Sequence, residues 1–391
     1  MKKLIFLMAT FYLIQAFASN PGLAALPLSL YLKETLRLTA TEVANFQIVV
    51  FLPWIIKPFW GGIFDSFTLF NYQFKSYFIL FYAMTVGLFI WLSGLETYDV
   101  SILTWAALLI STCIACADVL TDRLMILQGQ KSHQTAILQS AQWAALGLGS
   151  AAIVYLGGHL AALHNLSLTF LLSAIMPLAG VLVSFVVLQE EKVAKPPTTS
   201  ATHQLLWQIL QSKQFWLITS FIAWIGLSPT PPVLFYERDY LRLSELEVGT
   251  LQALESLAMG LGAIGFGMVT RNIQALRLWQ WTVGFSILAS LVRMLLHDTQ
   301  SAPLVHVCSG LLGIFATLGT LEVIARACPV GLEATTYTLL ISVSNLTRGL
   351  GLAEGAWLYD RGMELSMIAL VGALTASLGW FLIPLMRQEL P

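Results

Sequence analysis

The chain has 391 residues, of which 57% are hydrophobic and only 10% are charged, and its mean hydropathy is +0.76. Water-soluble domains carry about 25% charged residues, so this composition excludes an ordinary soluble domain and predicts a chain surrounded mostly by lipid. The formal net charge of -1 gives no support for nucleic-acid binding through overall basicity.

Apolar runs long enough to cross a bilayer follow one another along the whole chain. A spanning helix needs about 20 mostly apolar residues. The predicted helices of the first half cover residues 4–31, 42–64, 76–94, 101–121, 135–158 and 166–188. Those of the second half cover residues 214–236, 247–269, 277–297, 303–326, 334–358 and 365–386. The sequence therefore predicts an all-α membrane protein with twelve transmembrane helices, six in each half.

The first of these helices begins like a secretory signal peptide, with two lysines before an apolar run. The apolar sequence resumes after Asn20-Pro21-Gly22 and continues to Leu32. We therefore expect the first helix to be retained.

One segment occurs twice, as Tyr31–Val43 and again as Tyr236–Val248, with six of its thirteen positions identical. Each copy follows one apolar run and precedes another. Each also contains a capping box, Ser/Thr-x-x-Glu, which satisfies the free N–H groups at the start of the next helix. Because the repeat period is about half the chain, the sequence predicts two similar halves in tandem.

The predicted halves are two parallel-repeat six-helix bundles, residues 1–189 and 214–391. Between them lies a polar linker, residues 190–213, with a short amphipathic stretch that we expect to lie on the membrane surface. Of the 20 Lys and Arg residues, twelve fall on the inner side and five on the outer side if the N-terminus is inside. This bias predicts that both termini and the linker are cytoplasmic.

The remaining three basic residues lie within apolar segments, where a charge costs at least about 2.5–3.5 kcal/mol and normally faces a cavity or a partner. Lys57 shares one helix face with Gly61 and Asp65 in the proline-containing second span. Either Lys57 faces a cavity, or it extends to the inner membrane surface.

Two carboxylates, Asp118 and Asp122, share a face of the fourth span and repel unless a cation or proton intervenes. A proton relay or an inner gate would use such a pair. Alternatively, Asp122 is hydrated and Asp118 pairs with a neighbouring helix.

The second half has charges at comparable depths. Glu322 and Arg326 are spaced for local pairing in the tenth span, and Glu255 lies in the eighth. Arg348 lies in the middle of the eleventh span with Asn345 one turn away. A guanidinium with an amide neighbour in apolar sequence is a good receptor for a carboxylate.

Other chemistry finds little support in the sequence. Cys113 and Cys116 form a single C-x-x-C without a second pair, so we interpret them as buried apolar residues and expect no metal site. A P-loop and the hydrolase and metalloprotease motifs are absent from the sequence. We expect no cofactor and no enzymatic activity.

Several strings run from the first predicted span to the eleventh, and they resemble one known family. The two most specific are Pro53-Trp-Ile-Ile-Lys-Pro58 and Cys328-Pro-Val-Gly-Leu-Glu-Ala-Thr335. Supporting strings are Leu26-Pro-Leu28, Ala117-Asp-Val119 with Asp122, Ser342-Val-Ser-Asn345 and Gly355-Ala-Trp-Leu-Tyr-Asp360. On these strings the chain resembles the folate–biopterin transporter family, a branch of the major facilitator superfamily.

The resemblance implies secondary transport of folates or related pterins by a twelve-helix rocker, with protons as the coupling ion. A transporter of this kind would bind its substrate near the bilayer midplane between the two repeats. Lys57 and Arg348 would meet carboxylates, Asn345 would assist, and Trp54 would stack on the pterin. Proton coupling or gating would use a set of charged residues from both halves, Asp65, Asp118, Asp122, Glu255, Glu322 and Arg326.

Alternatives remain within this interpretation. The same fold could transport a different organic anion. An intramembrane enzyme with Asp118 and Asp122 as paired acids is disfavoured, because such pairs normally come from different elements around the reacting bond. We expect a monomer in the bacterial inner (plasma) membrane whose partners are lipid and a small-molecule substrate.

Overall fold

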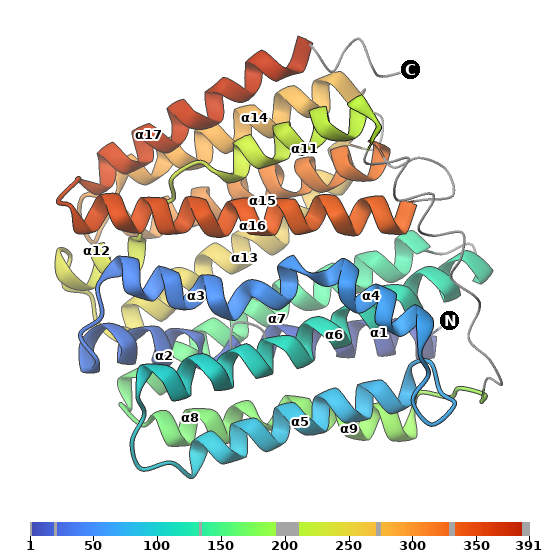
Figure 1. The fold of residues 1–391 in the computed structure, drawn as a ribbon. Coiled ribbons are helices and arrows are strands. Elements are labelled where there is room, and N and C mark those ends of the chain that lie inside the picture. Colours follow the sequence, from blue (N-terminus) through green and yellow to red (C-terminus); the bar gives the residue numbers. More distant parts are fainter. Residues whose placement is uncertain are drawn as a thin grey trace. The chain divides into compact units, whose positions relative to one another are not determined.

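The computed structural model describes residues 2–18, 22–132, 135–192, 211–270, 275–327 and 333–384 (Figure 1). Within these ranges the regular structure is helical, apart from one bridge between Leu69 and Tyr72. The side chains of some helical residues also lie outside the description, and among them are Asp65, Glu322 and Arg326.

The first half follows the predicted spans in order. Its helices are α1 (Lys2–Ala18), η1 (Gly22–Ala24), α2 (Ala25–Leu30), η2 (Tyr31–Thr35), α3 (Ala40–Ile55), α4 (Lys57–Ser66), α5 (Lys75–Ser93), α6 (Val100–Ser132), α7 (Thr135–Ala162), α8 (Leu166–Ser173) and α9 (Ile175–Val186).

The second half does the same. Its helices are α11 (Lys213–Gly226), α12 (Val233–Asp239), α13 (Glu245–Thr270), α14 (Ala275–Val292), η3 (Arg293–Leu295), α15 (Ala302–Ala327), α16 (Glu333–Asp360), α17 (Leu365–Ser377) and η4 (Leu378–Leu382).

Nine stretches of the described residues are long and apolar enough to cross a membrane, so the protein is multi-pass. They coincide with the predicted spans one to six, nine, ten and twelve. Of the other three predicted spans, the seventh contains the shorter apolar helix Phe215–Gly226, and the eighth and eleventh correspond to the long helices α13 and α16. The total of twelve spans stays a prediction.

Several predicted spans consist of two shorter helices that meet near prolines. The second span breaks at Ile56 near Pro53 and Pro58, and the sixth breaks at Ala174 ahead of Pro177. The seventh is interrupted between α11 and α12, where Pro229, Pro231 and Pro232 occur. A proline lacks the N–H that the helix requires, and its ring clashes with the preceding turn.

The repeated segment is also a structural repeat. Arg37 and Arg242 occupy equivalent positions, and both have a left-handed backbone, with φ of 59° and 55°. In both copies the preceding residue, Leu36 or Leu241, donates its N–H to the carbonyl of the tyrosine that opens the copy, at 3.0 and 3.1 Å. The repeat in the sequence therefore encodes the same turn twice.

The first predicted capping box is formed as expected. The Thr39 N–H donates to Glu42 Oε2 at 2.8 Å, and the Glu42 N–H donates to Thr39 Oγ1 at 3.2 Å. Asp360 adds to this cap, because its two carboxylate oxygens accept the N–H groups of Ala40 and Thr41 at 3.1 and 2.7 Å. The start of α3 is thus stabilised by three carboxylate or hydroxyl groups.

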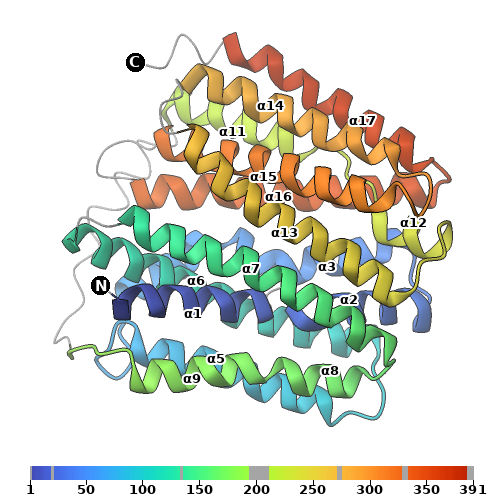
Figure 2. The ribbon, with the colours of Figure 1, turned by 180° about the vertical axis from the view of Figure 1, so that it is seen from behind.

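Helix pairing repeats along the chain as well (Figures 1 and 2). In the first half α1 packs against α7, and α5 packs against both α6 and α9. In the second half α11 packs against α16, and α14 packs against both α15 and α17. These are the same pairs when spans one to six are matched in order to spans seven to twelve, so each half repeats one bundle architecture.

The chain divides into two compact units. The first consists of Met1–Arg37, Val49–Thr199 and Glu245–Ala253, and the second of Leu38–Ile48, Ser200–Ser244 and Leu254–Pro391. The predicted linker, residues 190–213, falls largely on residues that the structure leaves undescribed, so the predicted domain boundary stays a prediction.

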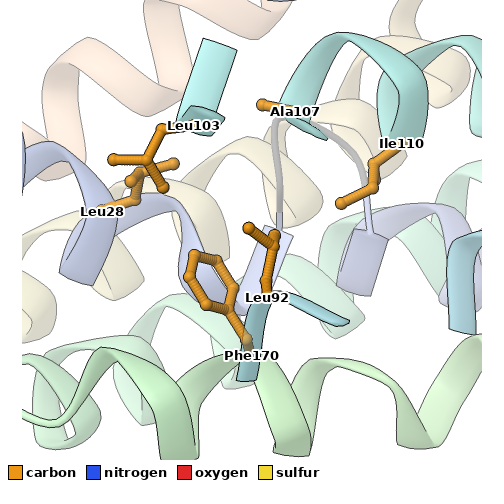
Figure 3. A pocket seen from close by; sticks show the side chains of 6 residues that line it. All are labelled: Leu28, Leu92, Leu103, Ala107, Ile110 and Phe170. Carbon is orange, nitrogen blue, oxygen red and sulfur yellow. The ribbon is translucent and has the colours of Figure 1, made fainter. Parts of the chain in front are cut away.

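Aromatic side chains fill the interior of each unit. The rings of Phe11 and Phe78 stack at 4.4 Å in the first, and those of Phe221 and Trp279 meet edge-on at 4.4 Å in the second. A gap in the first unit is too small to admit a water molecule (Figure 3). It is lined by the apolar side chains of Leu28, Leu92, Leu103, Ala107, Ile110 and Phe170, which makes it a packing void rather than a binding site.

Candidate functional site

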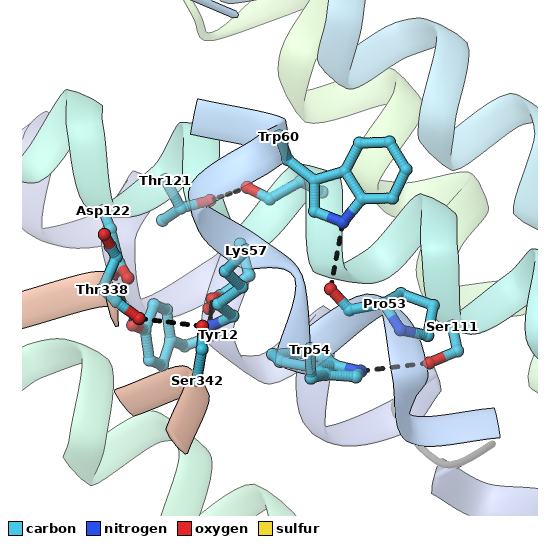
Figure 4. A network of polar contacts seen from close by, with 12 residues as sticks. Tyr12, Pro53, Trp54, Lys57, Trp60, Ser111, Thr121, Asp122, Thr338 and Ser342 are labelled. Atoms are coloured by element: carbon cyan, nitrogen blue, oxygen red, sulfur yellow. Dashed lines mark hydrogen bonds and ion pairs between the residues drawn. The ribbon is translucent and has the colours of Figure 1, made fainter. Parts of the chain in front are cut away.

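Charged and aromatic side chains gather where α3 ends and α4 begins, in the first unit. Pro53 lies inside α3, Pro58 lies in the first turn of α4, and Ile56 between the helices has φ −96° and ψ 21°. The indole N–H of Trp60 donates to the Pro53 carbonyl at 3.0 Å (Figure 4). This break sets the position of Lys57, the first residue of α4.

Lys57 forms a buried ion pair with a carboxylate on α6. Its Nζ contacts Oδ2 of Asp118, and the two side chains are only 13% and 3% exposed. The same ammonium lies 4.5 Å from the ring centroid of Trp54, within the range of cation–π attraction. The Trp54 indole donates in turn to Ser111 Oγ at 3.1 Å (Figure 4). Lys57 therefore has an anionic and an aromatic partner within the first unit.

A second carboxylate, Asp122, lies one helical turn further along α6. Tyr12 of α1 donates its phenolic O–H to Asp122 Oδ1 at 2.7 Å. Three helices, α1, α4 and α6, thus meet around two carboxylates and one ammonium. Because neighbouring carboxylates repel, the pairing within this cluster is sensitive to any proton or anion that enters it. Such an arrangement can couple the binding of a charged solute to a change in helix contacts.

The second unit presents a different kind of basic group. Arg348 and Asn345 lie on α16, where the Arg348 side chain is exposed and that of Asn345 is half-buried. Within the described part of the chain the Arg348 guanidinium forms no ion pair, and it interacts electrostatically with another guanidinium, that of Arg293 in η3. Its charge is therefore available to an anionic group.

The structure brings some of the predicted site residues together and leaves others apart. Lys57, Trp54, Asp118 and Asp122 form one cluster in the first unit. Arg348, Asn345 and Glu255 belong to the second unit, where Glu255 contacts His306 at 2.8 Å. The side chains of Asp65, Glu322 and Arg326 lie outside the described residues, and so does the predicted pairing of Glu322 with Arg326. The roles assigned to all of these residues stay predictions.

Three residues with notable contacts were missed by the sequence reasoning. Tyr12 and His306 are single polar residues in long apolar runs, and nothing in their spacing marks them. Glu237 did leave a signal, because the repeat aligns it with Leu32 of the first copy. A carboxylate in place of a leucine at a position that is fully buried in both copies is a departure that could have been noticed.

Comparison with known proteins places this arrangement in a family. A family model described as the BT1 family matches residues 19–367. The chain belongs to the BT1 family. Because this match spans most of the chain, the predicted resemblance to the folate–biopterin transporters is confirmed.

Curated relatives of this BT1-family protein come from a cyanobacterium, a plant and a protozoan. The folate-biopterin transporter of Synechocystis sp. is 28% identical over 393 aligned positions, covering 90% of this chain and 76% of that protein. The probable folate-biopterin transporter 2 of Arabidopsis thaliana is 23% identical, covering 89% and 74%. Folate transporter 1 of Plasmodium falciparum is 22% identical, covering 80% and 65%.

Solved structures show the fold of the BT1-family chain. Two crystal structures of the nucleoside transporter NupG, one of them of a mutant, superpose with TM-scores of 0.77 and 0.73 at 11% and 10% sequence identity. They cover 98% and 99% of this chain, and the matched parts make up 99% and 98% of the two NupG chains. The predicted all-α fold class is therefore confirmed, and the chain is a multi-pass membrane protein.

Proposed function

We propose that this BT1-family protein is a secondary active transporter that moves folates or related pterins by alternating access, coupled to protons. Relatives whose names state folate or folate-biopterin transport match along 80–90% of the chain. The observation that carries the proposal is the pairing of Lys57 with Asp118 inside the membrane helices of a chain with these relatives. A transporter of anions needs buried cations that can exchange one carboxylate partner for another.

The proposed substrate contacts follow from the chemistry of the described side chains. A folate presents carboxylates and a flat heteroaromatic ring. Arg348 forms a bidentate pair with a carboxylate, and Asn345 adds a hydrogen bond. Trp54 stacks on the ring. Lys57 releases Asp118 when a substrate carboxylate takes its place.

Coupling and gating are assigned to the charged residues of the membrane helices. Release of Asp118 from Lys57 leaves two neighbouring carboxylates on α6 without a cation, which favours the uptake of a proton by Asp118 or Asp122. Tyr12 stabilises the proton-free form of Asp122 through its hydrogen bond. The other proposed members of this set are Asp65, Glu255, Glu322 and Arg326.

Uptake into proteoliposomes tests the proposal directly. Purified protein is reconstituted, and the entry of labelled folate, biopterin and small dicarboxylates is measured with and without an imposed pH difference. We expect folate or biopterin to enter faster than the dicarboxylates, and the pH difference to increase the rate. Faster entry of a non-pterin anion would show instead a transporter of this fold with a different organic anion as substrate.

A matched pair of variants tests the substrate contact. Arg348→Ala is expected to lower the rate of uptake at least tenfold, because loss of a charge-assisted pair costs about 1.5–3 kcal/mol. Arg361→Ala makes the same change at an exposed arginine that stacks on Trp357 at 4.1 Å. It is expected to keep the wild-type rate. Equal rates in the two variants would refute the assignment of Arg348.

The cellular setting is part of the proposal. The bias of Lys and Arg toward one side supports a bacterial plasma membrane orientation with both termini in the cytoplasm. A reporter that is active only in the cytoplasm, fused after the last helix, should be active. We propose a monomer as the transporting unit, and the mass of the detergent-purified protein by light scattering tests this.

A further inference from the structure

Three titratable side chains form a cluster in the second unit. Glu237 on α12, Glu255 on α13 and His306 on α15 meet at the imidazole ring. Nε2 of His306 lies 2.6 Å from Glu237 Oε1, and Nδ1 lies 2.8 Å from Glu255 Oε2. The exposed fractions of the side chains are 4% for His306, 0% for Glu237 and 28% for Glu255. Glu255 is thus the only one of these three with appreciable access to solvent.

The geometry sets how many protons the cluster holds. Each N···O contact is a hydrogen bond only if a proton lies between its two atoms, and a neutral imidazole has one N–H. The two contacts together therefore require one proton more than a neutral histidine and two carboxylates possess. That proton makes either an imidazolium or a carboxylic acid. The cluster is thus a site that binds a proton from outside the three groups.

Glu237 is well placed to hold this proton as a carboxylic acid. Glu237 Oε2 is buried and has no hydrogen-bond partner among the described residues. A buried ionised carboxylate with one bare oxygen is costly, whereas a carboxylic acid is much less so. Gly310, one turn after His306, lets α15 approach α13 closely, since a Cβ there would lie 2.3 Å from the Glu255 carbonyl oxygen. This close packing holds His306 against Glu255.

The fold does not require these groups. With the repeats aligned, Glu237 corresponds to Leu32 and Glu255 to Val50 in the first half. Leu32 is 1% exposed, so an apolar residue fills the same buried position in the other copy of the bundle. Buried ionic groups are weak sources of stability, and apolar replacements are often neutral or stabilising. Their presence in the second half alone points to a role beyond packing.

The elements that carry or pack against the cluster hold charges of both signs, among them Arg238 and Asp239 on α12 and Glu354 and Asp360 on α16. Among the elements packed against α15, η3 contributes Arg293, which interacts electrostatically with Glu255, and α16 contributes Arg348, which interacts with Arg293. The charged residues of α11 and α14, Lys213 and Arg277, lie in the first turns of their helices. The charge of Glu255 is therefore linked through Arg293 to the guanidinium of Arg348.

We propose that Glu237, His306 and Glu255 form a proton-binding relay that takes up a proton coupled to transport, in addition to the proton bound by Asp118 or Asp122, with Glu255 as the entrance and Glu237 as the buried store. This inference rests on the proposed proton-coupled transport. When the imidazole carries its one N–H at Nε2, a proton from solvent binds Glu255 and passes to Nδ1 of His306. The proton on Nε2 then passes to Glu237 Oε1, so the ring is neutral again with its N–H at Nδ1, and the cluster has gained one proton and lost one negative charge.

The relay also explains how a proton promotes anion binding. Protonation of the cluster removes negative charge beside Arg293. The repulsion between the guanidiniums of Arg293 and Arg348 is then offset by less negative charge. An anion that binds Arg348 relieves this repulsion. By linkage, the proton raises the affinity for the anion, and the anion raises the affinity for the proton by the same factor.

Infrared spectroscopy tests the relay without any substrate. The pH of the purified, reconstituted protein is lowered, and the C=O stretch of a carboxylic acid is followed. We expect a band in the wild type that disappears in Glu237→Gln and shifts in His306→Gln. Glu354→Gln, the same change at an exposed carboxylate of α16, should keep it. A wild type without such a band, or one whose band is unchanged in Glu237→Gln, overturns the proposal.

Transport gives the second readout. A difference of one pH unit is worth about 1.4 kcal/mol per proton, or about tenfold accumulation of a solute that moves with one proton. The quantity compared is the rate of uptake with an imposed pH difference divided by the rate of uptake at equal pH. In Glu237→Gln and His306→Gln this ratio should fall toward one, while Glu354→Gln should keep the wild-type ratio. Glu237→Leu copies the first half and should fold with the same defect. Wild-type ratios in these variants overturn the relay.

The two readouts separate the relay from the transport function on which it rests. If no folate, pterin or dicarboxylate is transported at all, the proposed function fails. The infrared band still decides whether the cluster binds a proton.

Discussion

Replacing Lys57 by methionine removes the counter-charge of a carboxylate that is only 3% exposed. Methionine keeps most of the apolar stem beside Trp54, so the substitution acts mainly on the charge. Removal of one partner from a buried ion pair costs about 3–5 kcal/mol, because the remaining charge has neither water nor a partner. Asp122, one turn away, adds a like charge, so we expect the upper part of this range.

The reverse substitution should be milder. Asp118→Asn leaves Lys57 near Asp122, whose charge already interacts with that of Lys57. We expect the free energy of unfolding to decrease by about 2 kcal/mol, which is the contribution of a hydrogen bond to a charged group. In the double variant Lys57→Met/Asp118→Asn, the isolated charge of Asp118 is gone. The decrease in the free energy of unfolding of the double variant should therefore be smaller than the sum of the decreases in the two single variants, by about 2 kcal/mol or more.

Thermal unfolding of the four purified proteins in one detergent measures this cycle. For a unit of this size, Lys57→Met should lower the melting temperature by on the order of 10 °C. Lys3→Met makes the same change at an exposed lysine of α1 and should shift stability by less than about 0.5 kcal/mol. Additive losses, or a Lys57→Met protein as stable as Lys3→Met, would refute the argument that the pair is buried and mutually dependent.

Further predictions concern packing, substrate contact and pH. Gly355→Ala should destabilise the protein by about 1–3 kcal/mol in thermal unfolding, because its Cβ would lie 1.9 Å from a backbone carbonyl oxygen; Gly284→Ala, with nothing within 4 Å, is the control and should be neutral or stabilising. Arg348→Lys should raise the KM for folate with a smaller change in kcat, since an ammonium cannot form the bidentate pair. Hydrogen bonds from Ser301 lower the pKa of Asp298. These hydrogen bonds, donated by the N–H groups of Gln300 and Ser301 in the turn before α15, should therefore hold above the ordinary aspartate pKa of about 3.9 and weaken as pH falls through the lowered value. Hydrogen exchange at the N–H groups of Gln300 and Ser301 should show this loss in the wild type but not in Asp298→Asn.

The sequence was sufficient for the class of protein and for its internal repeat. Hydropathy and span length are properties of local windows, and lipid imposes them on every membrane helix regardless of its neighbours. The repeated segment was equally local, so that Arg37 and Arg242 adopt the same left-handed backbone within the same short turn. The prolines of the second span were visible in the sequence, and the structure shows that α3 ends and α4 begins between them.

The partners of the charged residues were decided only by tertiary structure. Helical spacing placed Asp118 and Asp122 on one face of one helix, but it could not show what that face meets. Lys57 is 61 residues from Asp118, and His306 is 69 residues from Glu237. Such contacts depend on how whole helices pack against one another, and a lone histidine or tyrosine in an apolar run gives no local sign of its partner.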